Sequence, residues 1–231
     1  NIDDIVFKIG PRINAAGRME SADKAVELLL AKNSARAKSV ANSVNFFNDA
    51  RKNIDRSITQ EALRLLSQEQ EMGERKTTVL YNSEWHKGVV GIVASRLIET
   101  YYRPTVILTA SNGLATGSAR SVVGFDIYQA IEACSDLLEN FGGHMYAAGL
   151  TLQIDKINDF RDRFEKVVSE KISDEQLIPQ VEIDSELKLS EITPRFYRIL
   201  KQFQPFGPEN MAPVFVTNDV ADNGEGRIVG I

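Results

Sequence analysis

Two glycine-rich segments carry the residue types that could hold an anion. Residues 142–149 contain three glycines, two alanines and His144, and residues 117–121 contain a Gly-Ser-Ala-Arg-Ser run. Glycine lacks a Cβ atom, so backbone N–H groups can converge on an anion, while guanidinium, hydroxyl and imidazole groups add donors. Together the two segments predict a phosphate-binding site. An isolated Gly-Gly pair has a second interpretation, which is an ordinary turn.

A third segment, residues 83–97, is typical of a polar loop that leads into a helix. His86 and Lys87 stand at its start, and Gly88 and Gly91 permit close approach of another group. The N-terminus of a helix adds unpaired N–H groups and a positive dipole end, both of which favour anions. Both histidines and the only tryptophan, Trp85, therefore lie in or beside glycine-rich segments. The alternative is a capped core helix with two structural histidines.

These segments, in this order, resemble the DHH-associated domain of the RecJ family of bacterial single-strand-specific 5′→3′ DNA exonucleases. The resemblance rests on the runs Trp-His-Lys-Gly-Val-Val-Gly-Ile-Val-Ala-Ser-Arg-Leu, Gly-Ser-Ala-Arg-Ser and Phe-Gly-Gly-His-x-x-Ala-Ala-Gly. Residues 9–19 look like the end of the family's catalytic DHH domain, and residues 203–213 look like the entry to its OB-fold. The resemblance covers nearly the whole chain in one collinear order.

The resemblance implies roles for individual residues. It assigns phosphate binding to the polar residues of the second segment, Ser118, Arg120 and Ser121. It places Gly142, Gly143 and His144 next to the scissile bond, with His144 as a catalytic residue that is not a metal ligand. It also implies that Arg12, Asn14 and Arg18 face the same cleft and grip a 5′-terminal phosphate. Two alternatives stay open: Arg12 and Arg18 could fix a surface loop, and Trp85 could stack on a base or pack in the core.

The family hydrolyses phosphodiesters with two metal ions held by clustered aspartates and histidines. This chain contains no Asp-His-His, Asp-x-Asp or His-Glu-x-x-His sequence, and its histidines, His86 and His144, are far apart. We therefore expect a fragment, running from Asn1 to Ile231, that lacks the metal-binding half. The expectation is no cofactor in this chain, Mn²⁺ or Mg²⁺ in the full-length protein, and no hydrolysis by the chain alone.

Composition and charge set limits on partners. The chain has 231 residues, 43% of them hydrophobic, and a net charge of −5. Residues 1–154 carry 17 basic and 17 acidic side chains, and residues 155–231 carry 10 and 15. Bulk attraction to DNA is therefore not expected, although a few arginines can still hold phosphates. The single Cys134 argues against a disulfide scaffold, and no signal peptide or membrane-length apolar run occurs, so we expect a cytoplasmic protein without a membrane partner.

Hydrophobic periodicity predicts a short helix capped by Ser21 and ending at Leu30, after an opening loop. A much longer helix is predicted over residues 34–71, because apolar residues recur at helical spacing. Its middle, residues 45–56, is polar, which suggests a strut with a solvated waist between two lobes. The alternative is an ordinary helix broken near Asn53.

From residue 76 onward the pattern predicts a small mixed α/β sheet with flanking helices, followed by an incomplete β module. Strands are predicted at 77–81, 105–110, 114–120, 149–154, 181–187 and 214–217, and helices at 87–102, 125–140, 156–172 and 194–204. Residues 222–226 are predicted to form a turn. The predicted domains are residues 1–33 (end of the DHH domain), 34–73 (connecting helix), 74–175 (substrate-binding domain) and 176–231 (start of the OB-fold).

The predicted function is the nucleic-acid-binding portion of a single-stranded-DNA exonuclease in DNA repair and recombination, with single-stranded DNA as its partner. One alternative is a phosphodiesterase of oligoribonucleotides or cyclic dinucleotides, and another is a non-catalytic nucleic-acid-binding module. If the glycine-rich segments form one site, His144 and Arg120 should lie on the same face of one sheet. The sequence does not identify protein partners or the oligomeric state.

Overall fold

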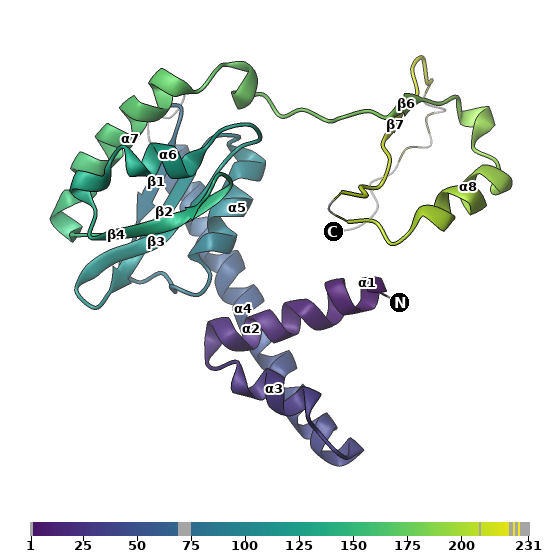
Figure 1. Cartoon of the computed structure of the whole chain (residues 1–231), viewed down its shortest axis with the longest axis horizontal. Helices are drawn as coiled ribbons and strands as arrows, with labels where there is room; N and C mark the ends of the chain where they lie inside the picture. Colours follow the sequence, from purple (N-terminus) through teal and green to yellow (C-terminus); the bar gives the residue numbers. More distant parts are fainter. Residues whose placement is uncertain (1, 69–74, 208, 222–223, 225, 227–231) are drawn as a thin grey trace. The chain divides into compact units, whose positions relative to one another are not determined.

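The computed structural model describes residues 2–68, 75–207, 209–221, 224 and 226. It divides into two compact units, residues 4–179 and residues 180–231 together with the first three residues. Figure 1 shows the sheet and the long helix of the larger unit. No helix in the described part of the chain is long and apolar enough to cross a membrane.

A five-stranded mixed sheet forms the centre of the larger unit. Its strands are β1 (Thr78–Tyr81), β2 (Thr105–Ser111), β3 (Leu114–Arg120), β4 (Asn140–His144) and β5 (Ala147–Leu152). They are arranged in the order β1-β2-β3-β5-β4, with β1 and β2 parallel and the other pairs antiparallel. This confirms the predicted α/β class. The hairpin between β2 and β3 turns at Asn112 and Gly113, whose φ angles of 53° and 79° are those a tight hairpin turn requires.

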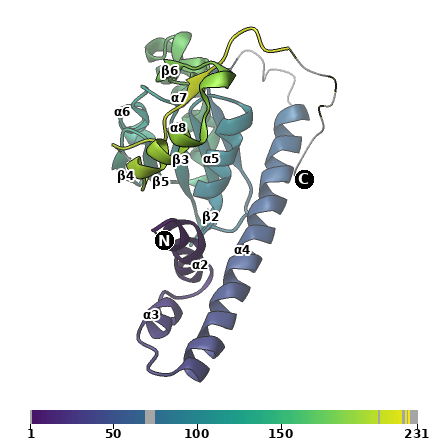
Figure 2. The same cartoon turned by 90° about the vertical axis from the view of Figure 1, so that its right-hand side faces the viewer.

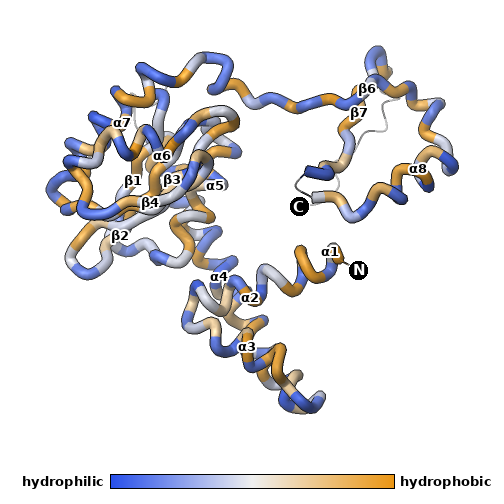
Figure 3. The backbone as a smooth tube through the Cα atoms, viewed as in Figure 1, coloured by the Kyte–Doolittle hydropathy of each residue, from blue (hydrophilic) through white to orange (hydrophobic). Residues whose placement is uncertain are grey.

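Helices cover the two faces of this sheet. One face packs against α6 (Ile127–Glu132) and α7 (Ile157–Lys171), where Phe160 and Phe164 stack at 5.5 Å between ring centroids. The other face packs Leu80 and Ile107 against α5 (Val90–Thr100) and the second half of α4 (Ser34–Gln68). In Figure 1, α6 and α7 lie on one side of the sheet and α5 on the other. The hydropathy colouring of Figure 3 shows many polar positions along α7, which buries only one side of its surface.

The predicted long helix is confirmed over its described residues, and Figure 2 shows it as one continuous helix without a break near Asn53. At 1.5 Å per residue its 35 residues span about 52 Å. The predicted solvated waist is confirmed only in part: residues such as Asn45, Asn53 and Arg56 are exposed, whereas Asn48 and Asp55 are 2% and 0% exposed. A buried carboxylate requires a paired cation, and Asp55 is paired with Arg51 and Arg96. Residues 69–71 of the prediction lie outside the described residues.

The predicted opening loop is also wrong. Residues Ile2–Asp4 (α1) and a π-helical turn, Ile5–Ile9, lead into helix α2 (Gly10–Met19). Pro11 is the second residue of α2, directly after the π-helical turn, which the Gly10 N–H closes by donating to the Ile5 carbonyl. Ala15 and Ala16 of α2 are fully buried. The next helix, α3 (Asp23–Leu29), begins near the predicted start, but its N-cap is Ala22 and not Ser21; Ser21 Oγ accepts the N–H of Asp23 at 3.1 Å.

The predicted helix over residues 125–140 is shorter than expected. Asp126 caps α6 by accepting the N–H of Gln129 at 3.1 Å, but α6 ends at Glu132 and only a 3-10 turn, Ser135–Leu137, follows. Residues 140–144, interpreted from the sequence as a loop, form strand β4 because they pair with β5. That pairing starts β5 at Ala147 instead of Gly149. Further 3-10 turns lie at Ile154–Lys156 and Glu175–Leu177.

The smaller unit contains a parallel pair of short strands, β6 (Ser185–Glu186) and β7 (Phe215–Val216). Helix α8 (Pro194–Leu200) starts at Thr193, whose Oγ1 accepts the N–H of Phe196 at 3.1 Å, and 3-10 turns lie at Leu189–Glu191 and Lys201–Phe203. The predicted helix is thus confirmed, whereas the strand predicted over 181–187 is only two residues long. The predicted turn at 222–226 falls mainly outside the described residues. The four domain boundaries remain predictions.

Candidate functional site

Arg120 and His144 lie on the same face of the sheet. Arg120 of β3 is in register with Ala147 of β5, which is in register with His144 of β4. Directly opposite residues of antiparallel strands point to the same side. Ser118 and Gly142 are aligned in the same way through Gly149. The register therefore confirms that the two segments share one face.

Most of residues 117–121 and 142–149 form strands and not anion-binding loops. The interpretation that their glycines let backbone N–H groups converge on an anion is therefore wrong in part. A Cβ atom at Gly117 would lie 2.0 Å from the carbonyl oxygen of Ile107, and one at Gly143 would lie 2.3 Å from that of Ala147. These two glycines are required where backbones approach closely within the sheet. Gly142 differs, because a Cβ atom there would have no neighbour within 4 Å. Only Gly142 of the Gly-Gly pair is therefore open to an incoming group.

The first turn of α5 lies directly against Arg120 and Ser118. A Cβ atom at Gly91 would be 2.8 Å from Arg120 Nη2 and 3.1 Å from Ser118 Oγ. Arg120 Nη1 donates to Ser118 Oγ at 2.6 Å and to the Ala119 carbonyl at 2.8 Å, so its side chain is held in place. The sequence thus folds the second and third glycine-rich segments into one site, with Gly91 as the residue that permits the contact.

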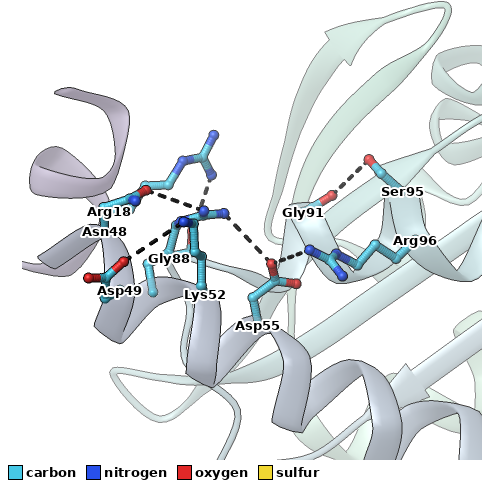
Figure 4. A network of polar contacts seen from close by, with 10 residues as sticks. Arg18, Asn48, Asp49, Lys52, Asp55, Gly88, Gly91, Ser95 and Arg96 are labelled. Atoms are coloured by element: carbon cyan, nitrogen blue, oxygen red, sulfur yellow. Dashed lines mark hydrogen bonds and ion pairs between the residues drawn. The ribbon is translucent and has the colours of Figure 1, made fainter. Parts of the chain in front are cut away.

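A second guanidinium approaches this site from α2. Arg18 Nη1 donates to the carbonyl oxygen of Gly88 at 3.1 Å, as Figure 4 shows. Burial, together with the charge of Arg18, lowers the pKa of Arg120 below its ordinary value. Neither arginine forms an ion pair with a carboxylate among the residues that the structure describes. Two cations beside the positive end of a helix repel one another until an anion joins them.

The other residues predicted on α2 have different surroundings. Arg12 Nε donates to Asn45 Oδ1 of α4 at 2.7 Å, and Arg12 Nη1 donates to the Lys8 carbonyl at 2.5 Å. The contact with Asn45 ties α2 to α4, so Arg12 has a structural contact, although not the surface loop of the alternative interpretation. Asn14 is exposed and precedes Arg18 by four residues, so both lie on one face of α2. Phosphate binding by Arg12 and Asn14 stays a prediction.

Residues 82–88, which we call the 82–88 loop, connect β1 to the turn before α5. Trp85 is only 4% exposed, so its ring packs in the core and is not available for stacking on a base. His86 Nδ1 accepts the N–H of Gly88 at 3.0 Å, which gives this histidine a structural contact. Lys87 is exposed. The predicted helix start at Lys87 is three residues early, since α5 begins at Val90.

His144 is exposed at the end of the edge strand β4. Its Nδ1 accepts the N–H of Tyr146 at 3.3 Å, which in a neutral imidazole leaves Nε2 as the protonated nitrogen. His144 can therefore offer Nε2–H as a donor to a ligand on this face. Ser121, just beyond β3, donates instead to the Phe125 carbonyl at 2.6 Å and closes the turn there.

A shallow hollow lies on the sheet beyond Ser118. Its volume is ≈ 280 Å³, and it is lined by Thr116, Gly117, Asn140, Phe141, Gly142, Gly149, Leu150 and Thr151. Thr116, Thr151 and Asn140 are aligned across β3, β5 and β4 in the next row of the face that carries Ser118. The sheet face thus carries Arg120, then Ser118, and then a row of hydroxyl and amide groups.

The described residues contain no group of three or more His, Cys, Asp or Glu side chains that could hold a metal ion. Cys134 is buried, and burial raises the pKa of its thiol to about 11, so it is not a reactive thiolate. The residues present therefore fit an anion site and do not fit a dinuclear metal centre.

Sequence reasoning missed the carboxylates of α4 that support the site. Glu61 accepts hydrogen bonds from Trp85 and Asn82, and Asp55 is paired with Arg96 of α5. The sequence signal for Asp55 is present but ambiguous, because it adjoins the apolar stripe of α4 inside a polar stretch. Only the packing of α5 against that stripe reveals the partners.

Comparisons with known proteins match both units. Residues 74–170 match the DHHA1 domain, and residues 183–231 match the RecJ OB domain. The chain is 35% identical over 226 residues to a single-stranded-DNA-specific exonuclease RecJ of Bacillus subtilis, covering 96% of this chain and 28% of that protein. It is 37% identical over 223 residues to the RecJ of Escherichia coli, covering 92% of this chain and 38% of that protein.

A solved structure agrees with these matches. The crystal structure of RecJ in complex with Mn²⁺ from Thermus thermophilus superimposes with a TM-score of 0.83 at 31% identity, covering 97% of this chain and 33% of that one. A structure of the same protein with Mg²⁺ gives a TM-score of 0.81, covering 92% of this chain and 32% of that one. The chain thus spans 28% and 38% of the length of the two curated relatives described above.

Proposed function

This chain carries a DHHA1 domain and a match to the RecJ OB domain, and from that premise we propose that it is the nucleic-acid-binding portion of a single-stranded-DNA exonuclease. The relatives that it resembles are single-stranded-DNA-specific exonucleases, which hydrolyse phosphodiester bonds. Because the chain spans less than two fifths of their length, their whole activity belongs to the proposal.

One observation carries the proposal: Arg120 Nη2 lies beside Gly91 and Arg18 Nη1 donates to the Gly88 carbonyl, so both guanidinium groups lie at the start of α5, without a carboxylate partner in the described residues. A phosphate would relieve their mutual repulsion and accept charge-assisted hydrogen bonds from both. Ser118 Oγ, already beside Arg120 Nη1, adds a hydroxyl. A terminal phosphate carries more negative charge than an internal one, so this site would prefer the end of a strand.

The single strand would then cross the face of β3, β5 and β4 toward His144. His144 lies two strand spacings from Arg120, about 9.5 Å by ordinary sheet geometry. The two residues can therefore contact different parts of one short strand segment. His144 Nε2–H would donate to an oxygen of the scissile phosphate, where negative charge develops during hydrolysis. Gly142 leaves room for that approach.

Further parts of the proposal concern the full-length protein. Holding a 5′-terminal phosphate beside the reacting bond gives 5′→3′ degradation, and such an activity serves DNA repair and recombination in the cytoplasm. Divalent Mg²⁺ or Mn²⁺ would supply the hydrolytic chemistry, since the related crystal structures are of RecJ in complex with these ions. The described residues of this chain do not fit a metal centre, so we expect no hydrolysis by the chain alone with either ion, measured on labelled oligonucleotides.

The test is binding of 5′-phosphorylated and 5′-hydroxyl oligodeoxythymidylates, each labelled at the 3′ end, measured by fluorescence anisotropy. The expected result is tighter binding of the phosphorylated strand, and loss of that preference in Arg120→Ala. Arg64→Ala is the matched control, because Arg64 is exposed on α4 and its Nη1 donates to Gln68 Oε1 of the same helix. Equal binding of the two oligonucleotides by the unsubstituted chain would contradict a terminal-phosphate site. Competition by RNA or cyclic dinucleotides tests the two other substrate classes.

A further inference from the structure

Glu61 of α4 makes two hydrogen bonds to the 82–88 loop. Its Oε2 accepts the indole N–H of Trp85 at 2.9 Å, and its Oε1 accepts from Asn82 Nδ2 at 3.0 Å. Both carboxylate oxygens are thus engaged by neutral donors on one loop. Asn82 Oδ1 in turn accepts the N–H of Glu84 at 2.9 Å, which fixes which way the Asn82 amide faces. A carboxylate is the side-chain group with two acceptor oxygens and no donor, so each of the two donors has an oxygen of its own.

The 82–88 loop links Glu61 to Arg18 of α2 through a series of hydrogen bonds. Thr109 Oγ1 donates to the Trp85 carbonyl at 2.6 Å, and the N–H of Gly88 donates to His86 Nδ1, so the chain between Trp85 and Gly88 has little freedom. The Gly88 carbonyl accepts from Arg18 Nη1. Gly88 also packs closely on the end of α2, since a Cβ atom there would lie 2.3 Å from the Arg18 carbonyl oxygen. The position of Gly88 therefore sets the position of the Arg18 guanidinium.

A second contact joins α4 to α5. Arg96 Nη2 donates to Asp55 Oδ2 at 2.9 Å, and Asp55 is fully buried between the helices. Figure 4 shows this contact on the same side of α4 as the Arg18–Gly88 hydrogen bond. Glu61 of α4 thus holds the loop before α5, and Asp55 of α4 holds Arg96 in the middle of α5.

We propose that Glu61 is a positioning residue for substrate: it couples the long helix α4 to the phosphate site by fixing the 82–88 loop, and thereby holds Arg18 toward Arg120. This inference rests on the proposed function of that site. Glu61 itself touches no substrate. If α4 moves relative to the sheet, this coupling shifts Arg18 and so changes the affinity for single-stranded DNA, while the residues that contact DNA stay the same.

The experiment uses Glu61→Gln in this chain. A glutamine keeps the shape of Glu61 but turns one acceptor into a donor, which then faces a donor of the loop. Trp85 is the only tryptophan of the chain, so its fluorescence and its indole N–H resonance report on this contact directly. We expect both signals to change, the dissociation constant for the 5′-phosphorylated oligonucleotide to rise about 10-fold, and its salt slope to fall by about one unit as one phosphate contact is lost.

Asp49→Asn is the matched control, because Asp49 is an exposed carboxylate of α4 whose ion pair is with Lys52. It should change neither the tryptophan signals nor binding. Trp85→Phe is the second variant: it removes the indole donor, keeps an aromatic ring in the core, and should weaken binding in the same direction. Non-additive effects of Glu61→Gln and Trp85→Phe would show that they act through one contact.

An unchanged dissociation constant and salt slope in both variants would overturn the inference, even if thermal stability fell, since Glu61 would then only stabilise the fold. Arg120→Ala separates this result from failure of the proposed function. Loss of binding in Arg120→Ala with normal binding in Glu61→Gln and Trp85→Phe rejects the positioning role alone. Normal binding in Arg120→Ala, or no binding by the unsubstituted chain, rejects the phosphate site and the positioning role together.

Discussion

Arg120 and His144 stand on one line across three strands, each in register with Ala147 between them. The His144–Ala147 pair belongs to the β4–β5 hairpin and is local in sequence, whereas Arg120 reaches the line from the earlier β2–β3 hairpin. The line places a guanidinium near the centre of the sheet and an imidazole at its edge, both directed to the same face. A ligand that contacts both side chains must therefore lie across the three strands.

Arg120→Ala should weaken binding of single-stranded DNA by about 1.5–3 kcal/mol, the usual range for a hydrogen bond to a charged group. The salt slope of the binding constant should fall by about one unit. Arg120→Lys should restore only part of the loss, because a lysine cannot replace the fork that contacts Ser118 Oγ and a phosphate together. Titrations at several salt concentrations measure both quantities. The same salt slope in the unsubstituted protein, Arg120→Ala and Arg120→Lys would mean that Arg120 has only a structural role.

His144→Ala, made in the full-length protein, should lower kcat more than it lowers metal affinity. The reason is that His144 donates through Nε2 and has no acidic, thiol or imidazole neighbours that form a metal site with it in the described chain. Steady-state kinetics with increasing Mn²⁺ separate the two effects. Recovery of full activity at high Mn²⁺ would instead mean that His144 is a metal ligand. Tyr146→Phe serves as a nearby control, since it keeps the backbone N–H that fixes the tautomer.

Gly143→Ala should destabilise the protein by about 1–3 kcal/mol, because its methyl group would meet the Ala147 carbonyl and the Ala148 backbone of β5. Gly142→Ala is the matched control, since the same methyl group meets no atom there. Urea denaturation followed by circular dichroism measures the difference. Equal stabilities of the two variants would show that the β4–β5 pairing is not as close as the structure has it.

Asp55→Ala should cost about 3 kcal/mol of unfolding free energy, because removal of one partner of a buried ion pair leaves the other without compensation. Arg51, on the same helix, is only 14% exposed and would lose its carboxylate partner. Arg96→Ala should cost less, since the Arg96 side chain is 45% exposed and Asp55 would keep Arg51. Thermal and urea unfolding of both variants test this order, and a larger loss for Arg96→Ala would contradict it.

The sequence by itself determined the features that depend on neighbouring residues. Apolar residues at helical spacing gave the long helix α4, and the Asn112-Gly113 pair gave the β2–β3 turn through its positive φ angles. The order of the glycine-rich segments also gave the resemblance on which the functional proposal rests. Each of these signals is local, because helix periodicity and turn chemistry act within a few residues.

Only the tertiary structure decided the features that depend on distant partners. Residues 140–144 form a strand because β5 offers them an edge to pair with, although their glycines alone favour a loop. Asp55 is buried because α5 supplies Arg96, a partner that no spacing rule links to it. Arg18 stands beside Arg120 because α2 packs on α4 and the 82–88 loop joins both. Packing brings together groups far apart in the chain, and the site exists only through that packing.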